Sequence, residues 1–257
     1  GPYGNRRGHI MSEQIEGRNA VLEAFRSGKC VDKLFILDGC QDGPVRTIAR
    51  EARKTDTIIN YVSKERLDQL SETRAHQGVI AQVAAYEYST VEEILARAEE
   101  KGEPPFLILL DNVEDPHNLG AIIRTANLAG AHGVIIPKRR AVGLTSTVAK
   151  TSAGAINYTP VAKVTNIVRT IEELKEKGIW FVCADMGGET MYDLDLTGPM
   201  GLVIGNEGEG VSRLVREACD FTASIPMKGD IDSLNASVAA GVLAYEIVRQ
   251  RLVKSSK

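Results

Sequence analysis

The sequence predicts an α/β protein in two parts, with a parallel-sheet α/β domain in the C-terminal part and a small α/β unit before it. Two observations support this prediction. In the second part, short and nearly continuous apolar runs alternate with helix-like stretches, as in a parallel sheet that helices cover on both faces. A Gly-Glu-Pro-Pro segment at residues 102–105 separates the two parts, and 257 residues are enough for two domains.

The first part alternates helical and β-branched segments from Gly17 onward. The pattern predicts helices over residues 18–26, 45–54, 64–70 and 91–101, and strands over 33–37, 58–62 and 79–83. Residues 85–104 hold 2 basic against 6 acidic side chains. We therefore expect a first domain over 11–84, an acidic linker over 85–104 and a second domain over 105–257. Residues 1–10 lack a periodic pattern and are interpreted as a remnant of an expression tag.

Five apolar runs predict the strands of the second part, at 106–110, 134–136, 180–184, 202–204 and 221–225. Helices are predicted at 119–129, 164–177, 211–218 and 237–252. The last of these carries one apolar face with Val238, Gly241, Val242, Tyr245 and Val248. Because ligands of such sheets bind at the carboxyl ends of the strands, we searched for polar or glycine-rich segments directly after them.

Bulk properties limit the classes of function. The apolar runs are too short to cross a bilayer and no apolar leader follows the start, so a cytoplasmic protein without a membrane partner is expected. The four cysteines lack a C-x-x-C pair and the four histidines lack a metal-ligand spacing, which predicts reduced thiols and no metal. No histidine has a nearby acid that suggests a catalytic relay. With a net charge of −3, nucleic-acid binding would depend on local clustering of basic residues.

The first segment after a strand reads DNVEDPHNLGAIIRTA from Asp111. Its Asp-Pro pair predicts a turn, Asn118 is expected to cap the following helix, and Gly120 permits a close approach of the backbone. Arg124 lies one turn inside that helix. Its side chain can act in a site or extend over apolar neighbours at the surface, and the segment alone leaves both readings open.

Two further segments complete the pattern. GNEGEG at residues 205–210 can present its amides to a ligand, although a plain turn also favours glycine and Glu207 disfavours a phosphate. IPMKGDIDSLNASVAAG at 225–241 alternates apolar side chains with free backbone amides, which suits an adenine ring and a methionine-like tail. Helix capping by Ser233 or Asn235 is the structural alternative.

Taken together, the three segments resemble the motifs of the TrmH-type branch of the SPOUT superfamily of RNA methyltransferases. The resemblance covers most of residues 106–252 and rests on N-x5-R, then GNEGEG, then IPM followed by SLNASVA. It implies a sheet with a deep trefoil knot, bound S-adenosylmethionine, and a homodimer whose protomers jointly form the active site. The first part resembles the L30e-like RNA-binding domain that precedes the catalytic domain in ribosomal RNA enzymes, including its His-Gln-Gly-Val pattern at 76–79.

Carried over by position, the resemblance implies two sets of site residues. The cofactor set comprises Ala184, Gly205, Ile225, Met227 and Leu234. The catalytic set comprises Asn118, Arg124, Glu207, Ser233 and Asn235. For contacts with the RNA backbone the chain offers the basic residues Lys138, Arg139, Arg140 and Lys150, for which a solvated loop is the alternative interpretation.

The resemblance implies S-adenosylmethionine-dependent methylation of a ribose 2′-hydroxyl in RNA. The N-terminal domain, which transfer-RNA relatives usually lack, favours a guanosine of large-subunit (23S) ribosomal RNA, as free RNA or in an assembling large ribosomal subunit. A transfer-RNA 2′-O-methyltransferase and an antibiotic-resistance ribosomal RNA methyltransferase are the alternatives within the family. A non-catalytic RNA-binding protein is the alternative of another class, and the joint presence of Asn118, Arg124, Glu207 and Asn235 argues against it. A nucleotide-dependent oxidoreductase is disfavoured because no G-x-G-x-x-G opens the first helix of the second part.

Overall fold

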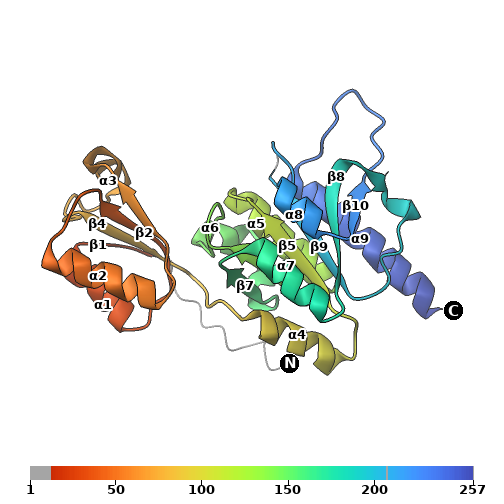
Figure 1. Cartoon of the computed structure of the whole chain (residues 1–257), viewed down its shortest axis with the longest axis horizontal. Helices are drawn as coiled ribbons and strands as arrows, with labels where there is room; N and C mark the ends of the chain where they lie inside the picture. The colour runs from red at the N-terminus through yellow and green to blue at the C-terminus, as the bar shows by residue number, and fades with distance from the viewer. Residues whose placement is uncertain (1–12, 207, 257) are drawn as a thin grey trace. The chain divides into compact units, whose positions relative to one another are not determined.

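The computed structural model describes residues 13–206 and 208–256, which form two compact units (Figure 1). Within these residues the smaller unit holds 13–87 with 143–146, and the larger holds 88–142 with 147–256. Two predictions lie outside the described residues, the tag remnant over 1–10 and the catalytic assignment of Glu207.

Within its described residues, the smaller unit is a four-stranded sheet with the order β1-β4-β2-β3. Strand β4 pairs antiparallel with β1 and β2, whereas β3 pairs parallel with β2. The strands are β1 (Glu13–Glu16), β2 (Val31–Leu37), β3 (Ile59–Val62) and β4 (Val79–Val83), and the helices are α1 (Arg18–Arg26), α2 (Gly43–Lys54) and α3 (Lys64–Leu70). Apolar side chains of α1 and α2, such as Phe25 and Ile48, pack on one face of the sheet around Leu34. The sequence did not predict β1, because its four residues contain a single apolar side chain.

Within its described residues, the larger unit is a six-stranded sheet in which every neighbouring pair of strands is parallel. The order β10-β8-β9-β5-β6-β7 places β9 and β5 at the centre, and both are buried along their whole length. The strands are β5 (Phe106–Asp111), β6 (Gly133–Pro137), β7 (Val161–Val164), β8 (Trp180–Thr190), β9 (Met200–Gly205) and β10 (Phe221–Ser224). The edge strand β7 was not predicted, because it is short and Lys163 interrupts its apolar run.

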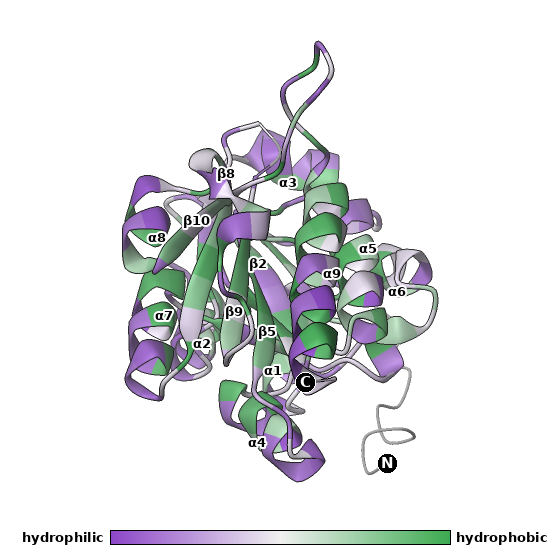
Figure 2. Ribbon diagram, turned by 90° about the vertical axis from the view of Figure 1, so that its right-hand side faces the viewer, coloured by the Kyte–Doolittle hydropathy of each residue, from purple (hydrophilic) through white to green (hydrophobic). Residues whose placement is uncertain are grey.

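Helices cover both faces of this sheet (Figure 2). Helices α4 (Val91–Lys101), α7 (Ile167–Glu176) and α8 (Arg213–Ala218) share one core with the sheet. On the other face α5 (Pro116–Leu128) packs beside α9 (Ala236–Ser255). The short helix α6 (Ser146–Thr151) and the 3-10 turns η1 (Ala155–Asn157) and η2 (Met191–Asp193) complete the unit.

Helix α4 lies inside the segment 85–104, where we expected a linker. Its Ile94 is fully buried in the core of the larger unit, and a side chain at Gly133 would collide with it. The segment from residue 88 therefore packs as part of the larger unit. In the described part of the chain, every helix is too short or too polar to span a membrane.

Candidate active site

A cavity of about 230 Å³ opens at the carboxyl ends of β8, β9 and β10. Three stretches far apart in the sequence form its wall, around residues 184–186, 204–210 and 223–239. All five residues of the predicted cofactor set line it, namely Ala184, Gly205, Ile225, Met227 and Leu234, and Ser233 of the catalytic set joins them. The residues that the sequence assigned to the cofactor therefore lie together around one cavity.

Ala184 reaches the cavity because β8 changes its register with β10. Thr222 pairs with Cys183, but the next residue, Ala223, pairs with Glu189, so the intervening residues of β8 leave the ladder as a bulge over residues 184–188. A side chain at Gly188 would collide with the Thr222 backbone, which explains the glycine there. The bulge thus directs residues 184–186 toward the cavity.

An ion pair holds this bulge from the side of α8. Arg216 Nη1 donates to Asp185 Oδ2 at 2.6 Å, and both side chains are partly exposed. Asp185 also lines the cavity, so the pair places a carboxylate at its wall. Because Arg216 compensates this carboxylate, the pair fixes the position of the bulge without adding net charge to the cavity wall.

The loop after β9 folds tightly under the cavity. Asn206 and Gly210 form an antiparallel bridge, in which each backbone N–H donates to the other's carbonyl at 3.1 and 2.8 Å. A Cβ at Gly205 would collide with the backbone of Gly210. Glycine is therefore required at residue 205 by a close approach of two backbone segments.

Two polar residues that the sequence analysis did not single out join the first motif to the second. Asn206 Nδ2 donates to the carbonyl of Asn112 at 3.0 Å, and Ser212 N donates to the buried carboxylate of Asp111 at 2.7 Å. These bonds connect the ends of the neighbouring strands β5 and β9. The available signal was an Asp or Asn directly after a buried strand, a position where such side chains often bond to backbone groups.

Asn235 caps the last helix. Its Oδ1 accepts hydrogen bonds from Ser237 N at 2.9 Å and from Ser237 Oγ at 2.6 Å. The capping interpretation is thus correct for Asn235, whereas Ser233 lies in the cavity wall. Capping also orients the exposed amide of Asn235 immediately after Leu234 of the cofactor set.

The first motif places its two predicted catalytic residues on α5, outside the cavity wall. Asp115 caps this helix, with Oδ1 accepting from His117 N at 2.8 Å, so the prediction that Asn118 is the cap is wrong. Pro116 takes the first helical position, which carries Asn118 into the first turn, where it is only 5% exposed. Arg124 is exposed and has no ion-pair partner within residues 13–206 and 208–256.

Glycine at position 120 has the role that the sequence predicted. A Cβ there would collide with the Thr151 side chain of α6, so α5 and α6 approach closely at this point. The residues predicted to contact the RNA backbone lie elsewhere in the larger unit. Lys138, Arg139 and Arg140 follow β6 directly, and Lys150 lies on α6. Of these, Arg139, Arg140 and Lys150 are exposed and Lys138 is partly buried.

Two histidines have acidic neighbours in space, although neither of the two lines the cavity. His76 Nε2 lies 2.7 Å from Asp68 Oδ1, and His132 Nε2 lies 3.2 Å from Glu103 Oε1. In each ring Nδ1 accepts a backbone N–H, from Gly78 and Phe106 respectively, which gives the histidines a structural role. Burial lowers the pKa of His132 below its usual value. The described residues contain no group of three His, Cys, Asp or Glu side chains that could hold a metal ion.

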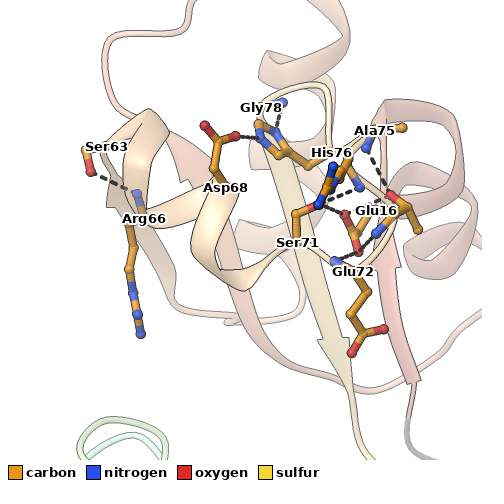
Figure 3. A network of polar contacts seen from close by, with 11 residues as sticks. Glu16, Ser63, Arg66, Asp68, Ser71, Glu72, Ala75, His76 and Gly78 are labelled. Atoms are coloured by element: carbon orange, nitrogen blue, oxygen red, sulfur yellow. Dashed lines mark hydrogen bonds and ion pairs between the residues drawn. The ribbon is translucent and has the colours of Figure 1, made fainter.

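In the smaller unit, one carboxylate organises the loop over residues 71–78 (Figure 3). Glu16 accepts hydrogen bonds from Ser71 Oγ at 2.5 Å and from the backbone N–H groups of Glu72 and Thr73 at 2.8 and 3.2 Å. Burial by itself raises the pKa of Glu16, but these bonds outweigh it and lower the pKa to about 2. The loop therefore depends on an ionised Glu16.

Comparison with known proteins gives matches over both units. The SpoU rRNA Methylase family matches residues 105–245, and the family of RNA 2′-O ribose methyltransferase substrate-binding domains matches residues 14–89. The chain is 51% identical over 245 residues to YacO of Bacillus subtilis, a protein assigned to the TrmH family of tRNA/rRNA methyltransferases, and the match covers 94% of this chain and 98% of YacO.

Solved structures give the same result. The SpoU methyltransferase AviRb from Streptomyces viridochromogenes, in complex with S-adenosylmethionine, has a TM-score of 0.60 at 28% identity over 94% of this chain and 91% of its own. The S-adenosylmethionine-bound rRNA methyltransferase from Sinorhizobium meliloti has a TM-score of 0.57 at 25% identity over 93% of this chain and 87% of its own.

These matches confirm the predicted fold class, a SPOUT-type parallel-sheet domain preceded by a smaller substrate-binding domain. They also confirm S-adenosylmethionine as the cofactor, since structural neighbours were solved with it. The first and second motifs, joined through Asn206, and the third motif around Leu234 meet at the end of the sheet where that cofactor is expected. The chain therefore belongs to the SpoU/TrmH family of RNA 2′-O-ribose methyltransferases, whose methyl donor is S-adenosylmethionine.

Proposed function

We propose that this enzyme methylates the ribose of a guanosine in large-subunit (23S) ribosomal RNA, as free RNA or within an assembling large subunit. The two-unit architecture carries the proposal, because the Sinorhizobium meliloti rRNA methyltransferase resembles the chain over 93% of its length, including the substrate-binding part. Choice of guanosine rests on the resemblance of the three motifs. Transfer RNA is the second candidate, because YacO is assigned to a family named for both substrates. A cytoplasmic location is part of the proposal, since the RNA is there.

The cavity suits S-adenosylmethionine by its chemistry. Ile225, Met227 and Leu234 offer apolar walls for the adenine ring and the methionine chain. The backbone amides of Asn206, Gly208, Glu209 and Gly210 donate within their own loop, so in this structure they are not presented to a ligand as the sequence suggested. When bound, S-adenosylmethionine supplies an electrophilic methyl group to the ribose oxygen.

The protein's task is to align the 2′-oxygen and to stabilise the charge that develops as its proton leaves. We assign the second role to the cationic guanidinium of Arg124. Arg124 also suits a neighbouring phosphate of the RNA. Asn235, oriented by its cap, is assigned to position the ribose. Glu207 is the candidate proton acceptor from the resemblance, and Ser233 lines the cavity. Asn118 makes no hydrogen bond with Arg124 in the described chain, so we do not assign to Asn118 a role in orienting Arg124.

A homodimer joined through α9 is part of the proposal. Ala240, Leu243 and Ile247 bury one face of this helix in its own unit, whereas Val238, Tyr245 and Leu252 remain 49%, 49% and 64% exposed along another face. Apolar residues therefore occur on both faces of α9 (Figure 2), as in a helix that is covered on both sides.

A second copy is the partner that fits best. Arg124 lies on α5 beside α9, is exposed, and does not line the cavity of its own chain. In a two-fold dimer the same surface faces itself, so each Arg124 can reach the partner's cavity. Val238, Tyr245 and Leu252 would then be buried at the interface.

The deciding experiment measures methyl transfer from radiolabelled S-adenosylmethionine to unmodified large-subunit rRNA, small-subunit rRNA, bulk tRNA and ribosomal precursors. The modified nucleoside is then identified. Labelled 2′-O-methylguanosine from large-subunit RNA supports the proposal. Label in tRNA alone overturns the substrate assignment, and no label in any RNA or precursor would favour a role in binding alone.

A further inference from the structure

Helix α2, labelled in Figure 1, belongs to the smaller unit and carries a concentration of basic residues. Residues 11–84 balance 11 basic against 11 acidic side chains, yet within α2 four basic residues stand against one acid. That acid, Glu51, lies 3.2 Å from Lys54 and is paired with it. The three remaining basic residues are Arg46, Arg50 and Arg53, which we name the arginine stripe.

The arginine stripe is continuous and exposed. Its members are spaced i, i+4 and i+7, which places them within a narrow arc of the helix and about 6 and 4.5 Å apart along its axis. All three are exposed, while Val45, Ile48 and Ala52 bury another face of the same helix. Within residues 13–206 and 208–256 none of the three has an ion-pair or side-chain hydrogen-bond partner.

Stability of the helix does not explain the stripe. Arg46 and Arg50 are a like-charge pair at i, i+4, which destabilises a helix by about 0.2–0.5 kcal/mol. Arg46 lies at the end of the first turn, where the helix dipole disfavours a cation, although the same dipole favours Arg53 in the last turn. Two of the three arginines therefore act against the helix that carries them.

We propose that the arginine stripe binds the phosphate backbone of the substrate RNA. This inference rests on the proposed function, since it assigns the surface of the smaller unit that holds the RNA. Phosphate contacts place a protein on RNA without reading its sequence, and exposed guanidinium groups bind phosphate oxygens in a bidentate manner. A row of three guanidinium groups, unpaired among the described residues, can contact successive phosphates of one strand. Because residues 11–84 are neutral in total, and hold 8 basic against 11 acidic side chains without the stripe, the stripe supplies local attraction where the total charge does not.

The test compares wild type with the Arg46→Gln/Arg50→Gln/Arg53→Gln variant of the full chain on unmodified large-subunit rRNA. We expect KM and the RNA Kd to rise by roughly tenfold, and the slope of log Kd against log salt to fall by about 2 to 3, since each lost phosphate contact removes about 0.7–0.9. The cavity lies in the other unit, so kcat and the affinity for S-adenosylmethionine should be unchanged. Thermal unfolding should be unchanged or slightly raised, because the like-charge pair is removed.

A matched pair of double variants gives the control. Arg46→Gln/Arg50→Gln and Lys64→Gln/Arg66→Gln each remove two exposed charges from a helix of the smaller unit. A larger loss of RNA affinity in the α2 double supports the proposal, whereas equal losses indicate nonspecific attraction and overturn it. A defect seen only with ribosomal particles, and not with free RNA, would assign the stripe to a protein partner and also overturn it. Failure of the proposed function is distinguishable, because wild type itself would then not methylate large-subunit rRNA.

Discussion

At the scale of single residues, the strongest constraint on the cavity is the absence of a side chain at Gly205. In the Gly205→Ala variant the new Cβ collides with the Gly210 backbone, so the loop must move away from the cavity. We expect affinity for S-adenosylmethionine, measured by calorimetry, to fall by at least about tenfold, or about 1.4 kcal/mol. Gly198→Ala is the matched control, because its Cβ would meet no atom within 4 Å and residue 198 does not line the cavity. Equal losses in both variants would contradict the close-approach argument.

Glu16 gives a prediction about pH. Its pKa falls from 4.5 to about 2 in the folded chain, so its ionised form contributes stability that is present above pH 4.5 and is lost as the pH falls toward 2. Glu16→Gln should lower the free energy of unfolding at pH 7 by about 1–2 kcal/mol, because hydrogen bonds to a charged group that is partly screened by solvent contribute about that much. The difference in free energy of unfolding between wild type and variant, followed by denaturant titration, should shrink between pH 4.5 and 2.

Glu72→Gln provides the control for this titration. Glu72 contributes its backbone N–H to the Glu16 carboxylate, and its own carboxylate points away from the network (Figure 3). We expect this variant to match wild type at every pH. A Glu16→Gln difference that stays constant down to pH 2.5 would show that the Glu16 charge does not hold the loop.

The residues that line the cavity could be predicted where a motif contained them. The prediction was less successful where two neighbouring residues could both take one role, such as a helix cap. Gly205, Ile225, Met227 and Leu234 were named from the second and third motifs and Ala184 from the resemblance alone, and all five surround one cavity. The cap of α5 was assigned to Asn118, but Asp115 followed by Pro116 offers a cap with a pre-set first turn, and this pair takes the position. Asn206 and Asp111 were missed because their partners are backbone groups of a neighbouring strand, which a linear sequence does not reveal.

At the scale of elements, the bulge of β8 is the feature that couples strand geometry to the cavity. Arg216→Gln removes its ion pair with Asp185 and frees residues 184–188. We expect the affinity for S-adenosylmethionine to weaken about threefold to tenfold. This is the size of effect expected when a partly exposed ion pair that also holds a ligand-binding segment in place is lost. High salt should weaken wild type toward the variant, because the pair is partly exposed.

Arg213→Gln is the matched control on the same helix. Arg213 pairs with Glu217 at 3.5 Å on the exposed surface of α8 and does not line the cavity. Its removal should leave the affinity for S-adenosylmethionine and the salt dependence unchanged. If Arg213→Gln and Arg216→Gln weaken binding equally, net charge and not the bulge would be responsible.

Most elements were predictable because their hydrophobic period is regular, as in α3 and α4, whose bounds match the expected ones. Short elements escaped, because β1 and β7 each have four residues and little apolar signal. For β8 the sequence predicted 180–184, but the strand runs to Thr190. Its extension depends on pairing with β10 in a second register, which is a tertiary property.

At the scale of the whole molecule, the spacing of apolar residues along a helix does not show which of its apolar faces stays exposed to solvent in a single chain. The sequence singled out an apolar face of the last helix with Val238 and Tyr245, and that face proves to be exposed, while Leu243 and Ile247 form the buried one. Similarly, no local pattern predicts how strands and loops thread through one another, so the knot was expected only from the resemblance. Whether two copies share an active site therefore has to be tested by experiment.

Complementation between two impaired variants provides that test, when activity is assayed at an S-adenosylmethionine concentration well below the Kd of the Gly205→Ala variant. Arg124→Ala keeps an intact cavity but lacks the guanidinium, and Gly205→Ala has the guanidinium but a disturbed cavity. If Arg124 acts in the partner's cavity, each mixed dimer contains one complete site, and random pairing of co-expressed chains should restore about a quarter of wild-type activity. If Arg124 acts within its own chain, every site in the mixed dimer carries one defect and activity stays at the level of the single variants. Purification with a different tag on each variant isolates the mixed dimer, whose methyl transfer should then approach about half of wild type.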